Sequence, residues 1–174
     1  MLKSLLIFIS INFYGGFAAI AQSSAEESNL KAAFVYNFTK YIDWGENEGA
    51  DFSIGIIGTS PVENALQEIA DTKTVDNKRI VIKHFDRPGD ITFCNVLFIS
   101  ADNDFALAAI LDEVKRGTLT VSEEPGFARR GTAFNFVVVN HKLKFEANVK
   151  SIFNAGLKAS SQLLKLAKIV DYKS

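Results

Sequence analysis

Apolar and polar positions along the chain follow first a helical and then an alternating helix and strand pattern. Ser24-Ala25-Glu26-Glu27 has the form of a capping box, so we predict that the first helix begins at Ser24. Apolar residues then recur at the spacing of one helical face. This face comprises Leu30, Ala33, Phe34, Asn37, Phe38 and Tyr41. The pattern predicts a helix that packs an aromatic stripe, with Asn37 inside it, against the rest of the protein.

The middle of the chain contains segments typical of strands in a parallel sheet. Residues 52–57 and 79–85 are rich in β-branched residues, and residues 92–100 are so continuously apolar that we expect cover on both faces. Between the first two segments, Ser60-Pro61-Val62-Glu63 supplies an N-cap, a proline at the first helical position and a capping glutamate. A further helix is predicted over residues 107–116, ending at Gly117, and a strand over 118–122.

The end of the chain predicts an antiparallel hairpin followed by helices. Residues 133–139 and 142–147 are the two strands, and the turn lies near Asn140-His141. The helices that follow have the apolar faces Val149, Ile152, Phe153 and Leu163, Leu164, Ala167, the second after a serine cap at Ser160 or Ser161. We therefore expect an α/β fold: a three-layer sandwich with a mixed, mostly parallel sheet flanked by helices, and with a C-terminal β-hairpin and helices.

The first residues have the pattern of a secretion signal. Lys3 precedes an apolar run too short to span a membrane, and the run is followed by Ala19-Ile20-Ala21. We predict a signal peptide over residues 1–21, cleaved after Ala21. No cysteine stands at that junction for a lipid anchor. Residues 22–174 should then form one domain outside the cytoplasm, without direct membrane insertion.

Charge and cysteine content remove several function classes. The formal net charge is −1, with acids and bases spread along the chain, so we expect neither nucleic acid nor an anionic membrane surface as a partner. Cys94 is the single cysteine and excludes an internal disulfide. Its apolar neighbours favour a small buried thiol, and a redox role is the alternative.

No pattern of catalysis or metal binding is present. His84 and His141 are far apart and have no partners at ligand spacing, and there is no nucleophile elbow. Asp102-Asn103-Asp104 precedes a predicted helix, where acids cap amides. The turn over residues 55–60 offers backbone amides that could hold an anion. We therefore predict no enzyme, no cofactor and no metal, and leave a small-ligand site open.

Polar residues inside the apolar segments need partners, because an unpaired buried amide or carboxylate costs about 1–3 kcal/mol. Asn37, Asn135, Glu146 and Asn148 are in this position. Two interpretations remain open: they satisfy nearby backbone groups, or they line a shared polar pocket or partner surface.

Several segments together resemble the YfiR family of periplasmic proteins. The resemblance rests on residues 31–44, KAAFVYNFTKYIDW; 94–100, CNVLFIS; 119–122, LTVS; 126–128, GFA; 135–136, NF; 145–148, FEAN; and 156–167, GLKASSQLLKLA. It covers nearly all of residues 22–174. It implies a compact α/β sandwich, a tendency to dimerise, and members that repress a membrane-bound diguanylate cyclase by contact.

The resemblance implies a periplasmic regulator that binds the extracytoplasmic part of an inner-membrane diguanylate cyclase or sensor kinase and restrains its output. Redox-responsive members carry further cysteines, whereas Cys94 has no partner in this chain. The alternatives are a small-ligand binding domain without a signalling partner and an enzyme of unrecognised type. Candidate contact residues are Tyr36, Asn37, Lys40, Trp44, Asn135, Glu146 and Asn148.

Overall fold

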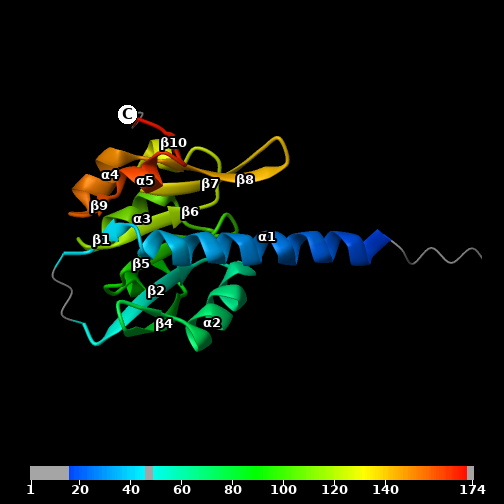
Figure 1. Ribbon diagram of the computed structural model, residues 1–174, viewed down its shortest axis with the longest axis horizontal. Helices are drawn as coiled ribbons and strands as arrows, with labels where there is room; N and C mark the ends of the chain where they lie inside the picture. The colour runs from blue at the N-terminus through cyan, green and yellow to red at the C-terminus, as the bar shows by residue number, and fades with distance from the viewer. Residues whose placement is uncertain (1–15, 46–48, 172–174) are drawn as a thin grey trace, which may run out of the picture.

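The computed structural model describes residues 16–45 and 49–171 and shows an α/β sandwich (Figure 1). The helices are α1 Gly16–Thr39, α2 Val62–Thr72, α3 Leu107–Glu113, α4 Val149–Asn154 and α5 Ser161–Leu164, with short 3-10 turns at η1 Pro88–Asp90 and η2 Ala128–Arg130. The strands are β1 Ile42–Asp43, β2 Asp51–Ile57, β3 Thr74–Val75, β4 Lys78–Phe85, β5 Val96–Ile99, β6 Leu119–Ser122, β7 Phe134–Val139, β8 Lys142–Ala147, β9 Lys158–Ala159 and β10 Lys168–Ile169.

In the described residues, one eight-stranded sheet has the order β10-β8-β7-β6-β5-β2-β4-β3. The five strands β4, β2, β5, β6 and β7 run parallel to one another, and β10 runs parallel to β8. The pairs β7–β8 and β3–β4 are antiparallel. The predicted mixed, mostly parallel sheet is therefore confirmed. Strands β1 and β9 form a separate two-stranded pair that joins the end of α1 to the C-terminal region.

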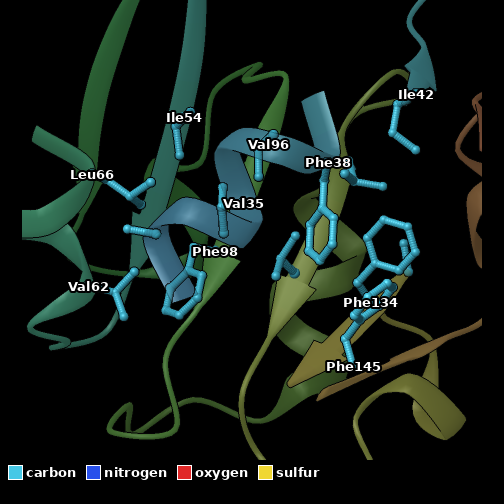
Figure 2. Packing of buried hydrophobic residues seen from close by; sticks show 14 of the residues in the cluster. Val35, Phe38, Ile42, Ile54, Val62, Leu66, Val96, Phe98, Phe134 and Phe145 are labelled. Carbon is cyan, nitrogen blue, oxygen red and sulfur yellow. The ribbon is translucent and has the colours of Figure 1, made fainter. Parts of the chain in front are cut away.

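The helix α1 crosses one face of the sheet, with α2 beside it (Figure 1). Val35 and Phe38 of α1 are 0% and 1% exposed. The Phe38 ring lies 4.7 Å from that of Phe134 and 4.8 Å from that of Phe145, between centroids. Figure 2 shows Val35 and Phe38 in the same cluster as Leu66 of α2. The first helix is thus a central part of the core.

The opposite face of the sheet has a smaller apolar cluster. Leu107 and Ile110 of α3 pack in one cluster with Leu97 and Ile99 of β5. Along β6 the same face is polar, because Thr120 and Ser122 alternate with the buried Leu119 and Val121, which belong to the α1 side. The second face is therefore apolar under α3 and polar beside it.

The first helix differs from the sequence prediction at its start and in its rotation. It begins at Gly16, so Ser24 lies inside it. From Ser24 onward, its fully buried apolar residues are Ala32, Val35 and Phe38, whereas Asn37 is exposed. The prediction that Asn37 lies inside the stripe was wrong, because the helix turns its aliphatic residues toward β2 and β5 and leaves Asn37 on the outer side.

Local caps were predicted with mixed success. Ser160 caps α5 by accepting a hydrogen bond from the Leu163 amide at 3.2 Å. Asn140 and His141 have positive φ angles of 51° and 59°, as a tight hairpin turn requires. By contrast, Glu63 does not cap α2, since its carboxylate lies 3.0 Å from the His84 ring nitrogen on β4. This contact between distant segments was not visible in the local pattern.

Two further local predictions were wrong. The segment Asp102-Asn103-Asp104 was expected to cap α3, but no side chain caps this helix. The Asn103 side-chain oxygen instead accepts a hydrogen bond from the Phe105 amide at 3.0 Å, in the turn before the helix. The predicted apolar face Val149, Ile152 and Phe153 is also not buried as a whole. On α4 only Ile152 is buried, whereas Val149 is 43% and Phe153 is 74% exposed. A helix of six residues buries one side chain on the core and leaves the others on the surface.

Cys94 is fully buried, as the sequence predicted. A Cβ atom placed on Gly55 would lie 2.9 Å from its Sγ, so the glycine makes room for the thiol next to β2. Burial raises the pKa of the Cys94 thiol to about 11 from the ordinary value of 9.0. Since the thiolate is the reactive form, the native thiol should be unreactive.

We predict that native protein reacts with a disulfide-exchange reagent at pH 8 at least about a hundredfold more slowly than protein unfolded in guanidinium, because a rise of about two pKa units removes that much thiolate. Absorbance of the released chromophore measures both rates. A Cys94→Ser, Asp86→Cys variant is the control and should react rapidly when folded, since the Asp86 side chain is 93% exposed. Equal rates for native and unfolded Cys94 would contradict the prediction.

Candidate partner-binding surface

The C-terminal end of α1 carries three of the predicted contact residues side by side. The Tyr36 hydroxyl donates a hydrogen bond to the Thr74 carbonyl at 3.2 Å, which fixes the ring between α1 and β3. The Lys40 ammonium lies 4.3 Å from the centroid of the Tyr36 ring, and 3.4 Å from the Asn37 side-chain oxygen. Asn37 and Lys40 are exposed and Tyr36 is half-buried. The three form an accessible aromatic and cationic patch.

Trp44 follows the helix and is half-buried. Its indole nitrogen donates to the Thr39 carbonyl at 2.9 Å, and this bond satisfies a carbonyl at the end of α1. Its ring stands edge-on to Phe52 of β2, with 5.1 Å between centroids. Most of these contacts are structural, and they fix the segment that follows α1. We call Tyr36, Asn37, Lys40 and Trp44 the α1-end surface.

The remaining predicted residues are buried, with exposed fractions of 0% for Asn135, 6% for Glu146 and 0% for Asn148. The Asn135 side-chain oxygen accepts from the Ser122 hydroxyl at 2.7 Å, and its amide donates to the Phe136 carbonyl at 3.3 Å. Glu146 pairs with Lys168 of β10 at 3.2 Å. These bonds tie neighbouring strands of the sheet together.

Asn148 joins two segments at the end of β8. Its side-chain oxygen accepts from the Ser151 amide at 3.0 Å and caps α4, while its amide donates to the Ala128 carbonyl at 2.7 Å. Every buried polar side-chain atom in the described residues has a hydrogen-bond partner. Of the two interpretations, satisfaction of nearby groups therefore describes Asn148 and Asn135.

The two groups of predicted residues do not come together. Asn135 and Glu146 are paired in register, and they alternate with Phe134 and Phe145, whose rings contact α1. Because successive side chains of a strand point to opposite faces, Asn135 and Glu146 point away from α1. The α1-end surface is therefore the accessible part of the predicted set.

A second feature lies where the carboxyl ends of β2, β5 and β6 meet, at the point where the strand order reverses, which in α/β proteins is a common ligand position. A crevice of about 320 Å³ is present there, lined by Ser60, Ser100 and Lys31 among others. The Glu123 carboxylate accepts from the Ala101 amide at 3.3 Å and from the Lys31 ammonium at 2.7 Å. The place where sequence reasoning allowed an external anion thus holds the chain's own carboxylate.

Lys31 links α1 to this crevice. Its ammonium lies 2.7 Å from Glu27 on its own helix and 2.7 Å from Glu123, and the Lys31 and Glu123 side chains are only 14% and 11% exposed. Burial by itself lowers the pKa of Lys31, but the hydrogen bonds with Glu123 and Glu27 outweigh it and hold the pKa above 10.5. The contribution that the raised pKa of Lys31 makes to stability is therefore fully present below pH 10.5 and is lost as the pH rises through the folded-state pKa.

Sequence reasoning missed Glu123 and Lys31 as a pair. The available signal was the position of Glu123 directly after β6, at the same end of the sheet as the turn over residues 58–60. In residues 16–45 and 49–171, no group of three or more His, Cys, Asp or Glu side chains could hold a metal ion. Within the same residues, none of the helices is both long and apolar enough to cross a membrane.

We predict that Asn148→Ala lowers the free energy of unfolding by about 1–3 kcal/mol, because it removes a helix cap and the shorter of two hydrogen bonds to the buried Ala128 carbonyl, which keeps the bond from the Gly131 amide at 3.3 Å. Thermal and denaturant unfolding followed by circular dichroism measure this change. Asn37→Ala is the matched control, and we expect it to change the free energy by less than about 0.5 kcal/mol. Equal effects of the two variants would show that the buried asparagine has no special structural role.

We also predict that Glu123→Gln destabilises the protein by about 1–3 kcal/mol at pH 7, since it removes the more buried of the two carboxylates that pair with the sheltered Lys31 ammonium. The control is Asp51→Asn, which breaks the exposed pair with Arg79 and should leave the unfolding free energy nearly unchanged. Denaturant unfolding compares the two. A loss for Asp51→Asn as large as that for Glu123→Gln would contradict the importance of this crevice for docking α1.

Most of the chain matches a known protein family. A family model described as YfiR/HmsC-like matches residues 28–168, from within α1 to β10. The matched part contains both core clusters and the α1-end surface. The chain therefore belongs to the YfiR/HmsC-like family.

Proposed function

We propose that this protein is a periplasmic regulator that binds the extracytoplasmic part of an inner-membrane diguanylate cyclase or sensor kinase and restrains its output. The observation that carries the proposal is the family match over residues 28–168. Family members are regulators rather than enzymes, and this agrees with a chain in which no catalytic motif was found. The chain then acts by contact, without a cofactor.

Export is part of the proposal. The pattern of Lys3, the apolar run and Ala19-Ile20-Ala21 supports cleavage after Ala21. Residues 1–15 lie outside the described part of the chain, and residues 16–21 lie in α1. Cleavage would leave Gln22 as the first residue, and the buried residues of α1 from Ser28 onward would remain in the mature chain. We propose that residues 22–174 form one periplasmic domain.

We propose the α1-end surface as the contact site. Tyr36 and Trp44 offer aromatic area that is already fixed by hydrogen bonds, so little side-chain freedom is lost when a partner covers it. Lys40 adds a positive charge beside Tyr36, and Asn37 adds an amide. Aromatic residues are enriched at the centres of protein interfaces, with polar groups around them.

The mechanism is a difference in affinity between two states of the partner. A bound protein restrains its partner only if it binds the inactive state more tightly than the active one, by about 1–3 kcal/mol for ordinary coupling. A stimulus in the periplasm would release the restraint by weakening that preference. Because Cys94 is buried and single, an internal disulfide is not the stimulus.

The test is site-specific capture in cells. A photo-crosslinking amino acid is placed at Asn37 or Lys40 in the full chain, and the captured protein is identified. We expect an inner-membrane protein with a cyclase or kinase output domain. The same amino acid at the highly exposed Asp86 should not capture it. Failure at Asn37 and Lys40, with folded protein present in the periplasm, would contradict the proposal, whereas capture of a second copy would indicate a homodimer at this surface.

Capture is then connected to output. We predict that Lys40→Glu raises the product of the captured enzyme at least about threefold, because a charge reversal at a contact commonly costs about 1 kcal/mol or more of binding. Cellular cyclic di-GMP or partner phosphorylation measures this, at equal levels of the regulator. Lys142→Glu, an equal charge reversal at the exposed end of β8, should leave the output unchanged. An equal rise for both variants would show that charge, not this contact, is responsible.

A further inference from the structure

A groove of about 540 Å³ lies on the sheet face away from α1, over β6 and between α3 and α4. Thr118 and Thr120 form its floor, and both hydroxyls are engaged: Thr118 donates to the Cys94 carbonyl at 2.7 Å, and Thr120 accepts from the Ala133 amide at 2.8 Å. The floor of the groove is therefore polar, and its two hydroxyl groups are held in place by hydrogen bonds to the backbone. The volume lies within the range of about 300–1,000 Å³ common for small-ligand sites.

The walls of the groove are held together by backbone contacts between distant segments. The turn after α3 closes with a hydrogen bond from the Thr118 amide to the Lys115 carbonyl at 3.2 Å. Gly117, with a φ of 89°, donates from its amide to the Ala155 carbonyl at 2.8 Å, and this bond docks the turn on the end of α4. The groove is thus a consequence of the fold and does not depend on the placement of one loop.

All charged side chains that line the groove are cationic: Lys115 and Arg116 come from the turn, and Lys150 comes from α4. Lys115 has a long contact of 3.7 Å with Glu113. Arg116 and Lys150 form no ion pair with any residue in the described part of the chain. In a protein with a net charge of −1, three converging cations without an acid among the lining residues form a local positive field.

The groove also has an apolar side. Leu111 and Val114 at the end of α3 and Ala155 at the end of α4 line it, and all three are half-buried. A ligand that fits both parts carries an anionic head for the cations and an apolar body for these side chains. Arg116 is the residue best suited to a carboxylate, sulfonate or phosphate head, because its planar guanidinium donates two parallel hydrogen bonds.

We propose that this groove binds a small amphipathic anion, with Arg116 and Lys150 holding its charged head. The site is separate from the α1-end surface, since it lies on the opposite face of the sheet. It goes beyond the proposed partner function and does not require it. The binding experiment below uses purified protein alone, so its failure and the failure of partner capture are distinguishable.

The probe is anilinonaphthalene sulfonate, an apolar fluorophore with one anionic group. We expect saturable binding to the native protein, and a loss of affinity of about tenfold or more in an Arg116→Glu, Lys150→Glu variant, because charged hydrogen bonds are replaced by repulsion. A Lys142→Glu, Lys144→Glu variant changes the net charge by the same amount at two exposed residues that do not line the groove, and it should keep the affinity of the unchanged protein. Phenylnaphthylamine, the same fluorophore without the sulfonate, should bind more weakly and should not respond to the double reversal.

Equal sulfonate affinities in the Arg116→Glu, Lys150→Glu variant and in the Lys142→Glu, Lys144→Glu control would overturn the proposal, and so would equally tight binding of phenylnaphthylamine. Thermal unfolding verifies that each variant is folded. If the double reversal does not fold, Lys150→Gln replaces it, because the exposed Lys150 side chain can be exchanged without loss of an ion pair in the described residues. Its affinity should then fall by about threefold or more, and an unchanged affinity would contradict the site.

Discussion

The contact between Phe38 of α1 and the β7–β8 hairpin determines much of the remaining arrangement. The Phe38 ring is within 5 Å of both Phe134 and Phe145, and all three side chains are almost completely buried. Truncation of one such ring typically costs about 3–5 kcal/mol, a large part of the stability of a small domain. The contact also joins an early helix to the late hairpin, so it forms only when the sheet between them is assembled.

Burial of this face of α1 fixes what the other faces present. With Val35 and Phe38 directed into the core, Asn37 and Lys40 lie outside, and Lys31 lies at the crevice where Glu123 meets it. One rotation of the helix therefore places both the α1-end surface and the ion pair. The Glu123 carboxylate at the ends of the parallel strands occupies a position that many α/β proteins leave to a ligand, and here it secures the helix instead.

Sequence patterns predicted those parts of the fold that depend on neighbours in the chain. The strands β2 and β4, the β7–β8 turn at Asn140-His141 and the Ser160 cap each have a complete local cause. Two of the predictions that were wrong depended on distant partners. Glu63 is engaged by His84, and Asn37 is turned outward because the core selects Val35 and Phe38. The spacing of apolar residues shows that a segment is helical. The exact rotation of the helix about its axis, and therefore which residues face the sheet, is determined by packing.

The difference between local and distant causes also applies to the polar residues, of which some are buried in strands and others are exposed cations. Asn135 and Asn148 were visible in the sequence because they interrupt apolar segments, and the structure shows each satisfied inside the protein. Arg116 and Lys150 interrupt no apolar segment, since an exposed cation on a turn or on a short surface helix is ordinary. What makes them notable is the bond from Gly117 to Ala155, which brings segments from two helices to one groove. In this fold, a polar residue in an apolar strand indicates internal hydrogen bonding, and a candidate site is found where unpaired charges from separate elements converge.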